Sequence, residues 1–202
     1  MRKSRKEAGF TLLETIVVAA IILIMAGVAL FQIIPSMKSA KSQTALETTL
    51  GIMRRYHEAA VDQRRIYEIV FTQPGTLQVN VEVFNSDGTT SWNAVETYTL
   101  PRETQFIAVA GIPTSTGTPD GLGQGANAID FMVDNGGGYN TVVFQKDGRA
   151  TDTLGRLNNG VVYIAQPGDL TSSRAVSVLG ATGRVKGWKL FPGTNGPIWE
   201  SL

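Results

Sequence analysis

The chain of 202 residues contains no cysteine and one histidine, His57. The lack of cysteine excludes a disulfide framework, a thiol nucleophile and cysteine metal sites. It does not fix the compartment, because an extracytoplasmic domain with a large enough core needs no disulfides. His57 stands beside an apolar helical stripe without other potential ligands, so we interpret it as a packed or solvated side chain.

Recognisable catalytic patterns are also missing. No serine stands in a nucleophile elbow, and no pair of acidic residues stands out. The glycine-rich stretch 121–126, GLGQGA, lacks the spacing and the strand-to-helix setting of a dinucleotide loop. Asp134 and Asn135, followed by three glycines, could hold calcium, yet no third acidic ligand is near. We expect no enzyme, no cofactor and no metal site.

Positive charge is concentrated at the N-terminus. The first eight residues carry four basic side chains against Glu7, a net charge of +3. Because the whole chain carries +1, the remainder carries −2. The basic character therefore belongs to the leader, while the rest is slightly acidic.

A long apolar run follows this leader. Residues 10–34 comprise 25 residues, about the length that crosses a bilayer core. A cleaved secretory signal would have a shorter apolar core, and a buried helix of a soluble domain would be striped. The positive-inside rule keeps the leader in the cytoplasm and puts the chain after Pro35 on the far side. The sequence predicts one membrane-spanning helix.

Glu14 is a carboxylate inside this apolar run. A charged side chain at the centre of a membrane helix costs about 2.5–3.5 kcal/mol, although position 14 is near the cytoplasmic end. One interpretation is a carboxylate that reaches the interface and has no further role. The other is a carboxylate that awaits a cation within an assembly.

Helical spacing resumes beyond Pro35, where a kink or local melting is expected near residues 32–36. Apolar residues then recur every three or four positions, which predicts an amphipathic helix to residue 65: Leu46, Leu50, Met53, His57 or Tyr56, and Ala60.

Alternating apolar and polar residues, typical of strands, begin at Ile66. Segments 66–73, 77–84 and 95–100 predict an antiparallel meander. Further short strands are expected over 128–133, 140–145, 160–166, 174–180 and 184–191, whereas loop 111–127 has no assignment. The predicted fold class is α+β, a long N-terminal helix packed on an antiparallel domain of two sheets.

The string KEAGFTLLE, residues 6–14, resembles the processing signal of type IV prepilins and type II secretion pseudopilins. This resemblance implies that a prepilin peptidase cuts between Gly9 and Phe10 and methylates the new amine of Phe10. It also implies that Glu14 neutralises this amine when subunits assemble. The expected segments are a cleaved leader (1–9), a transmembrane and assembly half-helix (10–34), an amphipathic half-helix (35–65) and a periplasmic β-rich domain (66–202).

The C-terminal half is similar to the H-type minor pseudopilins of type II secretion and the related FimT-like minor pilins. The resemblance rests on two turns, which that group places in a two-sheet domain: Asp147, Gly148 and Arg149 in the first, and Thr182, Gly183, Arg184 and Val185 in the last. It implies a minor pseudopilin or pilin in the bacterial inner membrane. The implied partners are prepilin peptidase, other pilins in a filament and secreted cargo.

The alternative is a FimT-like minor pilin that binds DNA for uptake. Its basis is a group of basic and aromatic residues near the C-terminus that could meet phosphates and bases: Arg174, Arg184, Lys186, Trp188 and Lys189. The same residues could contact a protein partner, and the slightly acidic remainder of the chain weighs against DNA.

Overall fold

The computed structural model describes residues 11–132 and 138–202, with the side chains of all of these except 29–36, 116, 132 and 138–139. Gly9, Phe10, Asp134 and Asn135 of the predicted sites therefore lie outside the described residues. The chain divides into two compact units, Met1–Lys38 and Ser39–Leu202, referred to below as unit 1 and unit 2.

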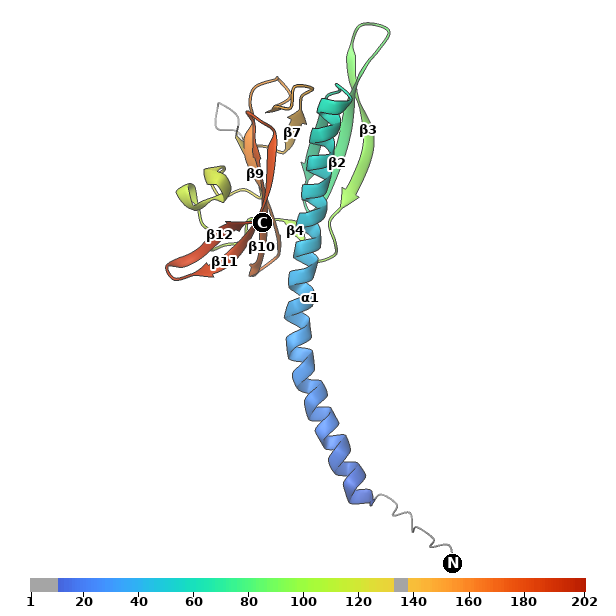
Figure 1. Ribbon diagram of the computed structural model, residues 1–202, viewed down its shortest axis with the longest axis vertical. Coiled ribbons are helices and arrows are strands. Elements are labelled where there is room, and N and C mark those ends of the chain that lie inside the picture. The colour runs from blue at the N-terminus through green and yellow to red at the C-terminus, as the bar shows by residue number, and fades with distance from the viewer. Residues whose placement is uncertain (1–10, 133–137) are drawn as a thin grey trace, which may run out of the picture. The chain divides into compact units, whose positions relative to one another are not determined.

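One helix, α1, runs from Leu12 to Asp62 (Figure 1). The helix is uninterrupted at Pro35, so the predicted local melting is wrong. Proline removes one backbone hydrogen bond, and the remaining bonds of the flanking turns continue the helix. Two short 3₁₀ helices, η1 (Ser115–Gly117) and η2 (Pro119–Gly121), lie in the loop that the sequence left unassigned.

The strands form two antiparallel sheets. The five-stranded sheet has the order β3-β2-β1-β7-β8, with strands β1 (Tyr67–Thr72), β2 (Thr76–Phe84), β3 (Thr90–Thr99), β7 (Thr141–Phe144) and β8 (Ala150–Thr151). The seven-stranded sheet has the order β12-β11-β10-β9-β5-β6, and β4 also pairs with β9. Its strands are β4 (Gln105–Phe106), β5 (Ile129–Met132), β6 (Gly138–Tyr139), β9 (Asn159–Gln166), β10 (Asp169–Leu179), β11 (Arg184–Gly193) and β12 (Gly196–Ser201).

The core of unit 2 joins α1 to both sheets. The buried face of the helix includes Leu46, Met53, Tyr56 and Ala60, as the helical spacing predicts, whereas Leu50 is half-buried. The same cluster includes Ile69 and Phe71 of β1, Leu77 and Val79 of β2, and Val176 and Val178 of β10. A Cβ atom on Gly187 of β11 would lie 3.2 Å from Leu50 Cδ2, so glycine permits the close approach of the helix. The predicted α+β class, with a helix on two antiparallel sheets, is confirmed.

His57 connects the helix to one turn of each sheet. Its Nε2 atom lies 2.9 Å from the carbonyl oxygen of Gly148, in the β7–β8 turn, and its ring packs edge-on against Phe144. Gly183, in the β10–β11 turn, has φ +60°, and a Cβ there would lie 2.5 Å from His57 Nε2. The packed role expected for the lone histidine therefore has a specific location.

The C-terminal cap of α1 has an arginine, Arg64, at the position where glycine is usual. Arg65 N–H donates to Ala60 O at 3.2 Å and Arg64 N–H to Val61 O at 3.4 Å, which is the hydrogen-bond pattern of a Schellman motif. Arg64 has φ +53°, in the left-handed region where glycine is the usual residue. An L-residue in this conformation costs about 1–2 kcal/mol.

Two substitutions of Arg64 remove the same charged side chain but differ in backbone strain, so comparing them isolates the cost of the positive φ. We expect Arg64→Gly to be more stable than Arg64→Ala by about 1 kcal/mol, because only glycine relieves the positive φ. The measurement is the free energy of unfolding from urea titration. Equal stability of the two variants would contradict a strained cap.

Candidate functional site

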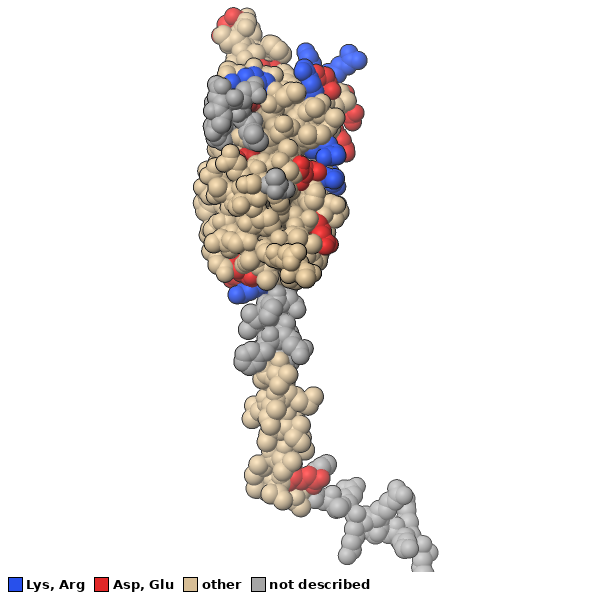
Figure 2. Space-filling model, turned by 90° about the vertical axis from the view of Figure 1, so that its left-hand side faces the viewer, with Lys and Arg blue, Asp and Glu red and all other residues tan. Residues whose placement is uncertain are grey.

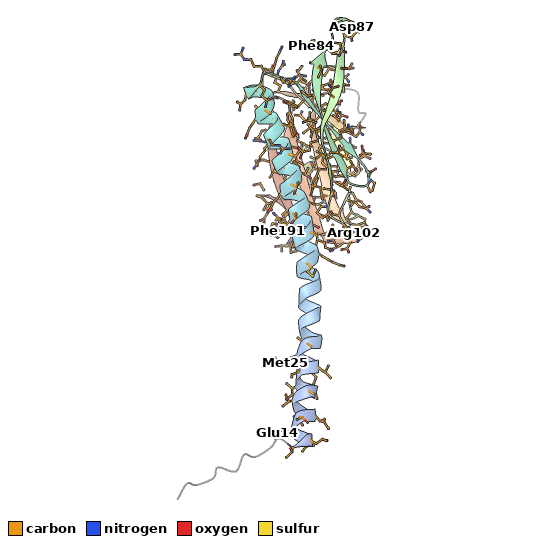
Figure 3. All side chains as sticks on the ribbon, turned by 90° about the vertical axis from the view of Figure 1, so that its right-hand side faces the viewer. Glu14, Met25, Phe84, Asp87, Arg102 and Phe191 are labelled. Carbon is orange, nitrogen blue, oxygen red and sulfur yellow. The ribbon has the colours of Figure 1, made fainter. Side chains whose placement is uncertain are left out.

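The helix of unit 1 begins with a side-chain cap. The backbone N–H of Glu14 donates to Thr11 Oγ1 at 3.3 Å, and the Thr11 to Glu14 spacing is that of a capping box. A carboxylate in the first turn also interacts favourably with the helix dipole. Figure 3 shows Glu14 at this end of the helix. Glu14 therefore has a local role in starting the helix, besides the assembly role that the sequence predicts.

Apolar side chains of unit 1 are exposed around the whole helix. Every described side chain from Thr11 to Val28 is exposed, and the large apolar ones include Leu12 (78%), Leu13 (73%), Leu23 (73%), Ile24 (68%) and Met25 (67%). Because these residues are consecutive as well as three or four apart, they point in all directions from the helix axis. Such a surface is stable only when another apolar phase covers it.

The predicted span of residues 10–34 extends beyond these described side chains at both ends. Within the described residues, no helix meets the combined requirement of length and hydropathy for crossing a membrane. In the same part of the chain, no three acidic or histidine side chains gather as metal ligands.

Arg174 does not lie on the surface, which corrects its prediction as a DNA or partner contact. The side chain is fully buried. Its Nε donates to Gln43 Oε1 and its Nη2 to Ser39 Oγ, both at 3.2 Å, while Nη1 donates to the carbonyl oxygens of Thr171 and Ser173. Burial lowers the pKa of Arg174, and the negative charge of Asp169 opposes that shift. Arg174 ties β10 to the first turns of α1 in unit 2.

The other four residues of that prediction lie on β11, and the strand divides them between its two faces. Arg184, Lys186 and Trp188 alternate on one face, whereas Lys189 is on the other. Lys186 lies over the Trp188 ring at 5.1 Å from its centroid, and Lys189 over the Phe191 ring at 4.8 Å. The structure therefore does not bring the five predicted residues together into one surface.

Asp120 pairs with both basic residues of the first face, Arg184 and Lys186. Its Oδ1 lies 3.3 Å from Arg184 Nη2 and 3.6 Å from Lys186 Nζ. Its Oδ2 accepts from Ser177 Oγ at 2.7 Å, and Ser177 Oγ accepts from Trp188 Nε1 at 2.8 Å. Asp120 belongs to η2, so the unassigned loop is anchored on β10 and β11. Its only sequence signal was one acidic residue within a glycine-rich stretch.

The same loop covers a second apolar cluster on the seven-stranded sheet. Ile112 and Leu122 from the loop pack with Val161, Tyr163 and Leu190, and with the partly buried Trp199. Burial raises the pKa of the Tyr163 phenol, and the nearby Asp130 charge raises it further. Asp130 in turn accepts the backbone N–H of Gln124, which fixes the end of the loop.

Charge is unevenly distributed on the visible face of unit 2. Figure 2 shows most basic side chains toward one end and one side of it, with acidic ones among them, a further basic group at the opposite end and a broad uncharged area between. A continuous basic track, as polyanion binding requires, is not visible on this face.

Comparison with known proteins identifies the N-terminal segment. Residues 4–30 match the family described as the prokaryotic N-terminal methylation motif. This match confirms the resemblance to type IV pilin-like proteins at the segment where the sequence predicted it. It implies a membrane-anchored subunit that faces the periplasm. No curated protein matches the chain at a significant level.

Two solved structures are similar to the chain. The minor pseudopilin EpsH from the type 2 secretion system of Vibrio cholerae has a TM-score of 0.42 and 11% identity, over 80% of this chain and 96% of that one. The type IV minor pilin FimU of Pseudomonas aeruginosa strain PAO1 has a TM-score of 0.40 and 16% identity, over 71% of this chain and 84% of that one.

Arg174 is buried and Arg184 is about half-exposed, so their removal should lower the stability of the protein by different amounts. We expect Arg174→Ala to lower the free energy of unfolding by about 3 kcal/mol, because it leaves a cavity and unpaired buried acceptors. Arg184→Ala removes a half-exposed ion pair and should cost less than about 1 kcal/mol. Urea titration of both variants measures the difference, and equal costs would contradict the buried role of Arg174.

Proposed function

We propose that this protein is a minor subunit of a type II secretion pseudopilus or a type IV pilus. The observation that carries the proposal is the methylation motif at residues 4–30, joined to a helix whose first turns expose apolar side chains on all sides. The subunit is inserted in the bacterial inner membrane with one span, its N-terminus in the cytoplasm and its β-rich domain in the periplasm. It works mechanically and by recognition, without catalysis.

Processing by prepilin peptidase is the first step. The basic residues of the leader hold it on the cytoplasmic side, where the enzyme cuts between Gly9 and Phe10 and methylates the Phe10 amine. Cleavage removes the net charge of +3 carried by the first eight residues. The product begins with an amine four residues before Glu14.

Assembly then pairs this amine with Glu14. The two charges attract far more strongly among apolar side chains than in water, which offsets much of their desolvation cost. Pairing between neighbouring subunits would set the axial register of the filament. Lipid covers the exposed apolar side chains of residues 12–28 before assembly, and the helices of other subunits cover them afterwards.

The β-rich domain gives the subunit its individual surface. A minor rather than a major role is favoured by the chain length and by the β7–β8 and β10–β11 turns, whose residues resemble those of the H-type minor pseudopilins. In this role the domain contacts fellow minor subunits or secreted cargo.

The cleavage site has a direct test. We expect Gly9→Leu, expressed in a strain with prepilin peptidase, to accumulate as a precursor that retains residues 1–9, because a bulky side chain obstructs the cut. Gly51→Leu is a matched control, since Gly51 is exposed on α1 and an added Cβ atom there would have no other atom within 4 Å. Immunoblotting and N-terminal mass spectrometry distinguish the forms. Mature-sized Gly9→Leu protein would refute the assigned site.

The role of Glu14 is tested by separating charge from capping. We expect Glu14→Gln and Glu14→Leu to insert in the membrane but to enter filaments at least about tenfold less, because removing one partner of a buried ion pair costs about 3–5 kcal/mol. Thr11→Val removes the hydrogen bond to Glu14 N–H and keeps the charge, so it should assemble. The measurement is the ratio of subunit in sheared filaments to subunit in membranes. Undiminished incorporation of Glu14→Gln would sink the pairing.

A further inference from the structure

A basic hollow lies at the C-terminal end of α1 in unit 2. It has a volume of about 330 Å³ and is lined by Arg64, Arg65, Ile66, Glu82, Val83, Phe84 and Lys146. These residues come from the end of the helix, the end of β2 and the β7–β8 turn. Figure 3 shows Phe84 near the far end of β2, with Arg102 at the opposite end of unit 2.

The three cations of this hollow have no acidic partner. Within the described residues, no ion pair and no side-chain hydrogen bond involves Arg64, Arg65 or Lys146, and all three are exposed. The acidic side chains nearby are Glu82 in the hollow, Asp62 on the last turn of α1 and Asp147, which follows Lys146 in the sequence. Asp147 forms its ion pair with Arg149. The three cations outnumber the one carboxylate of the hollow, Glu82, so a further anion would reduce their mutual repulsion.

The backbone of Arg64 is strained, because its φ of +53° lies in the left-handed region. Its left-handed backbone would be unstrained with glycine, and the charge of an arginine at a helix C-terminus could be supplied from a neighbouring position without that strain. Strained residues that the surrounding structure maintains are concentrated at functional sites. Besides this strained arginine, the hollow has an exposed aromatic ring, because the side chain of Phe84 is 77% exposed.

We propose that this hollow binds an acidic peptide segment of a partner protein. Arginine binds a carboxylate through two parallel hydrogen bonds, and Arg64 and Arg65 offer two such forks. Phe84 supplies an apolar surface for the residue next to the carboxylate. Glu82 accepts a backbone N–H of the same segment, which a peptide can donate.

The geometry favours a peptide over a nucleic acid. The hollow is the size of one or two side chains, whereas a polyanion needs a track of cations along its backbone. Glu82, Asp62 and Asp147 would repel the phosphates that flank the bound one. A peptide can place one carboxylate between Arg64, Arg65 and Lys146 and direct its other residues away from these acidic side chains.

The test uses the full chain in detergent micelles and a fluorescein-labelled octapeptide in which two glutamates flank a leucine. Fluorescence anisotropy should show saturable binding with a dissociation constant below about 1 mM. The same peptide with glutamines in place of the glutamates should bind at least about tenfold more weakly.

Arg64→Gly and Arg64→Ala should each weaken binding of the acidic peptide about tenfold, although they differ in stability. Arg102→Ala removes one exposed cation at the other end of unit 2 and should bind as the parent does.

The proposal would be overturned by no binding, by equal binding of the two peptides, or by Arg64 variants that bind as tightly as the parent. Tighter binding of a twenty-nucleotide single strand that is lost in Arg64→Gly would overturn it in favour of nucleic acid. None of these readouts depends on Gly9 or Glu14, so they are independent of the proposed function.

Discussion

The structure of unit 2 depends on burying one face of α1 against residues from both sheets. An amphipathic helix is stable only when its apolar stripe is covered, and neither sheet alone supplies the cluster that covers Leu46, Met53 and Tyr56. Polar contacts near both ends of this packed part of the helix help to fix it in that position. Arg174 holds its first turns to β10, and His57 holds its last turns between the β7–β8 and β10–β11 turns.

This packing gives one chain two regions with opposite surfaces. In unit 2 the helix hides its apolar residues in a core, whereas in unit 1 it displays them on every side. A protein with these two surfaces needs apolar surroundings for unit 1 both before and after it assembles with other subunits. In the proposed function lipid and neighbouring helices would meet that need in turn, which links membrane insertion to assembly.

Periodic patterns predicted most of this fold, because they report which side of an element is buried. The apolar stripe of α1 and the alternating strands from Ile66 were confirmed on that basis. The short strands β4, β6 and β8 and the edge strand β12 were missed, since pairing in these segments is imposed by neighbouring strands and leaves no strong alternation. Arg174 was misread for a related reason: a basic residue on a strand looks the same whether its partners are water or the carbonyl groups of Thr171 and Ser173. Asp120 and Arg64 owe their importance to long-range contact and backbone conformation, which a single sequence does not report.

The cap at Thr11 refines what must be explained about Glu14. A capping box accepts glutamine as readily as glutamate, so helix initiation accounts for a side chain of this shape but not for its charge. The helix dipole favours the charge by only about 0.3–1 kcal/mol, whereas burial of a carboxylate among apolar side chains costs several times more. If Glu14 is buried on assembly, as the proposed function holds, the remainder would come from a cation outside the described helix. In the proposed function this cation would be the amine created by cleavage before Phe10, which would form only once the leader has been removed.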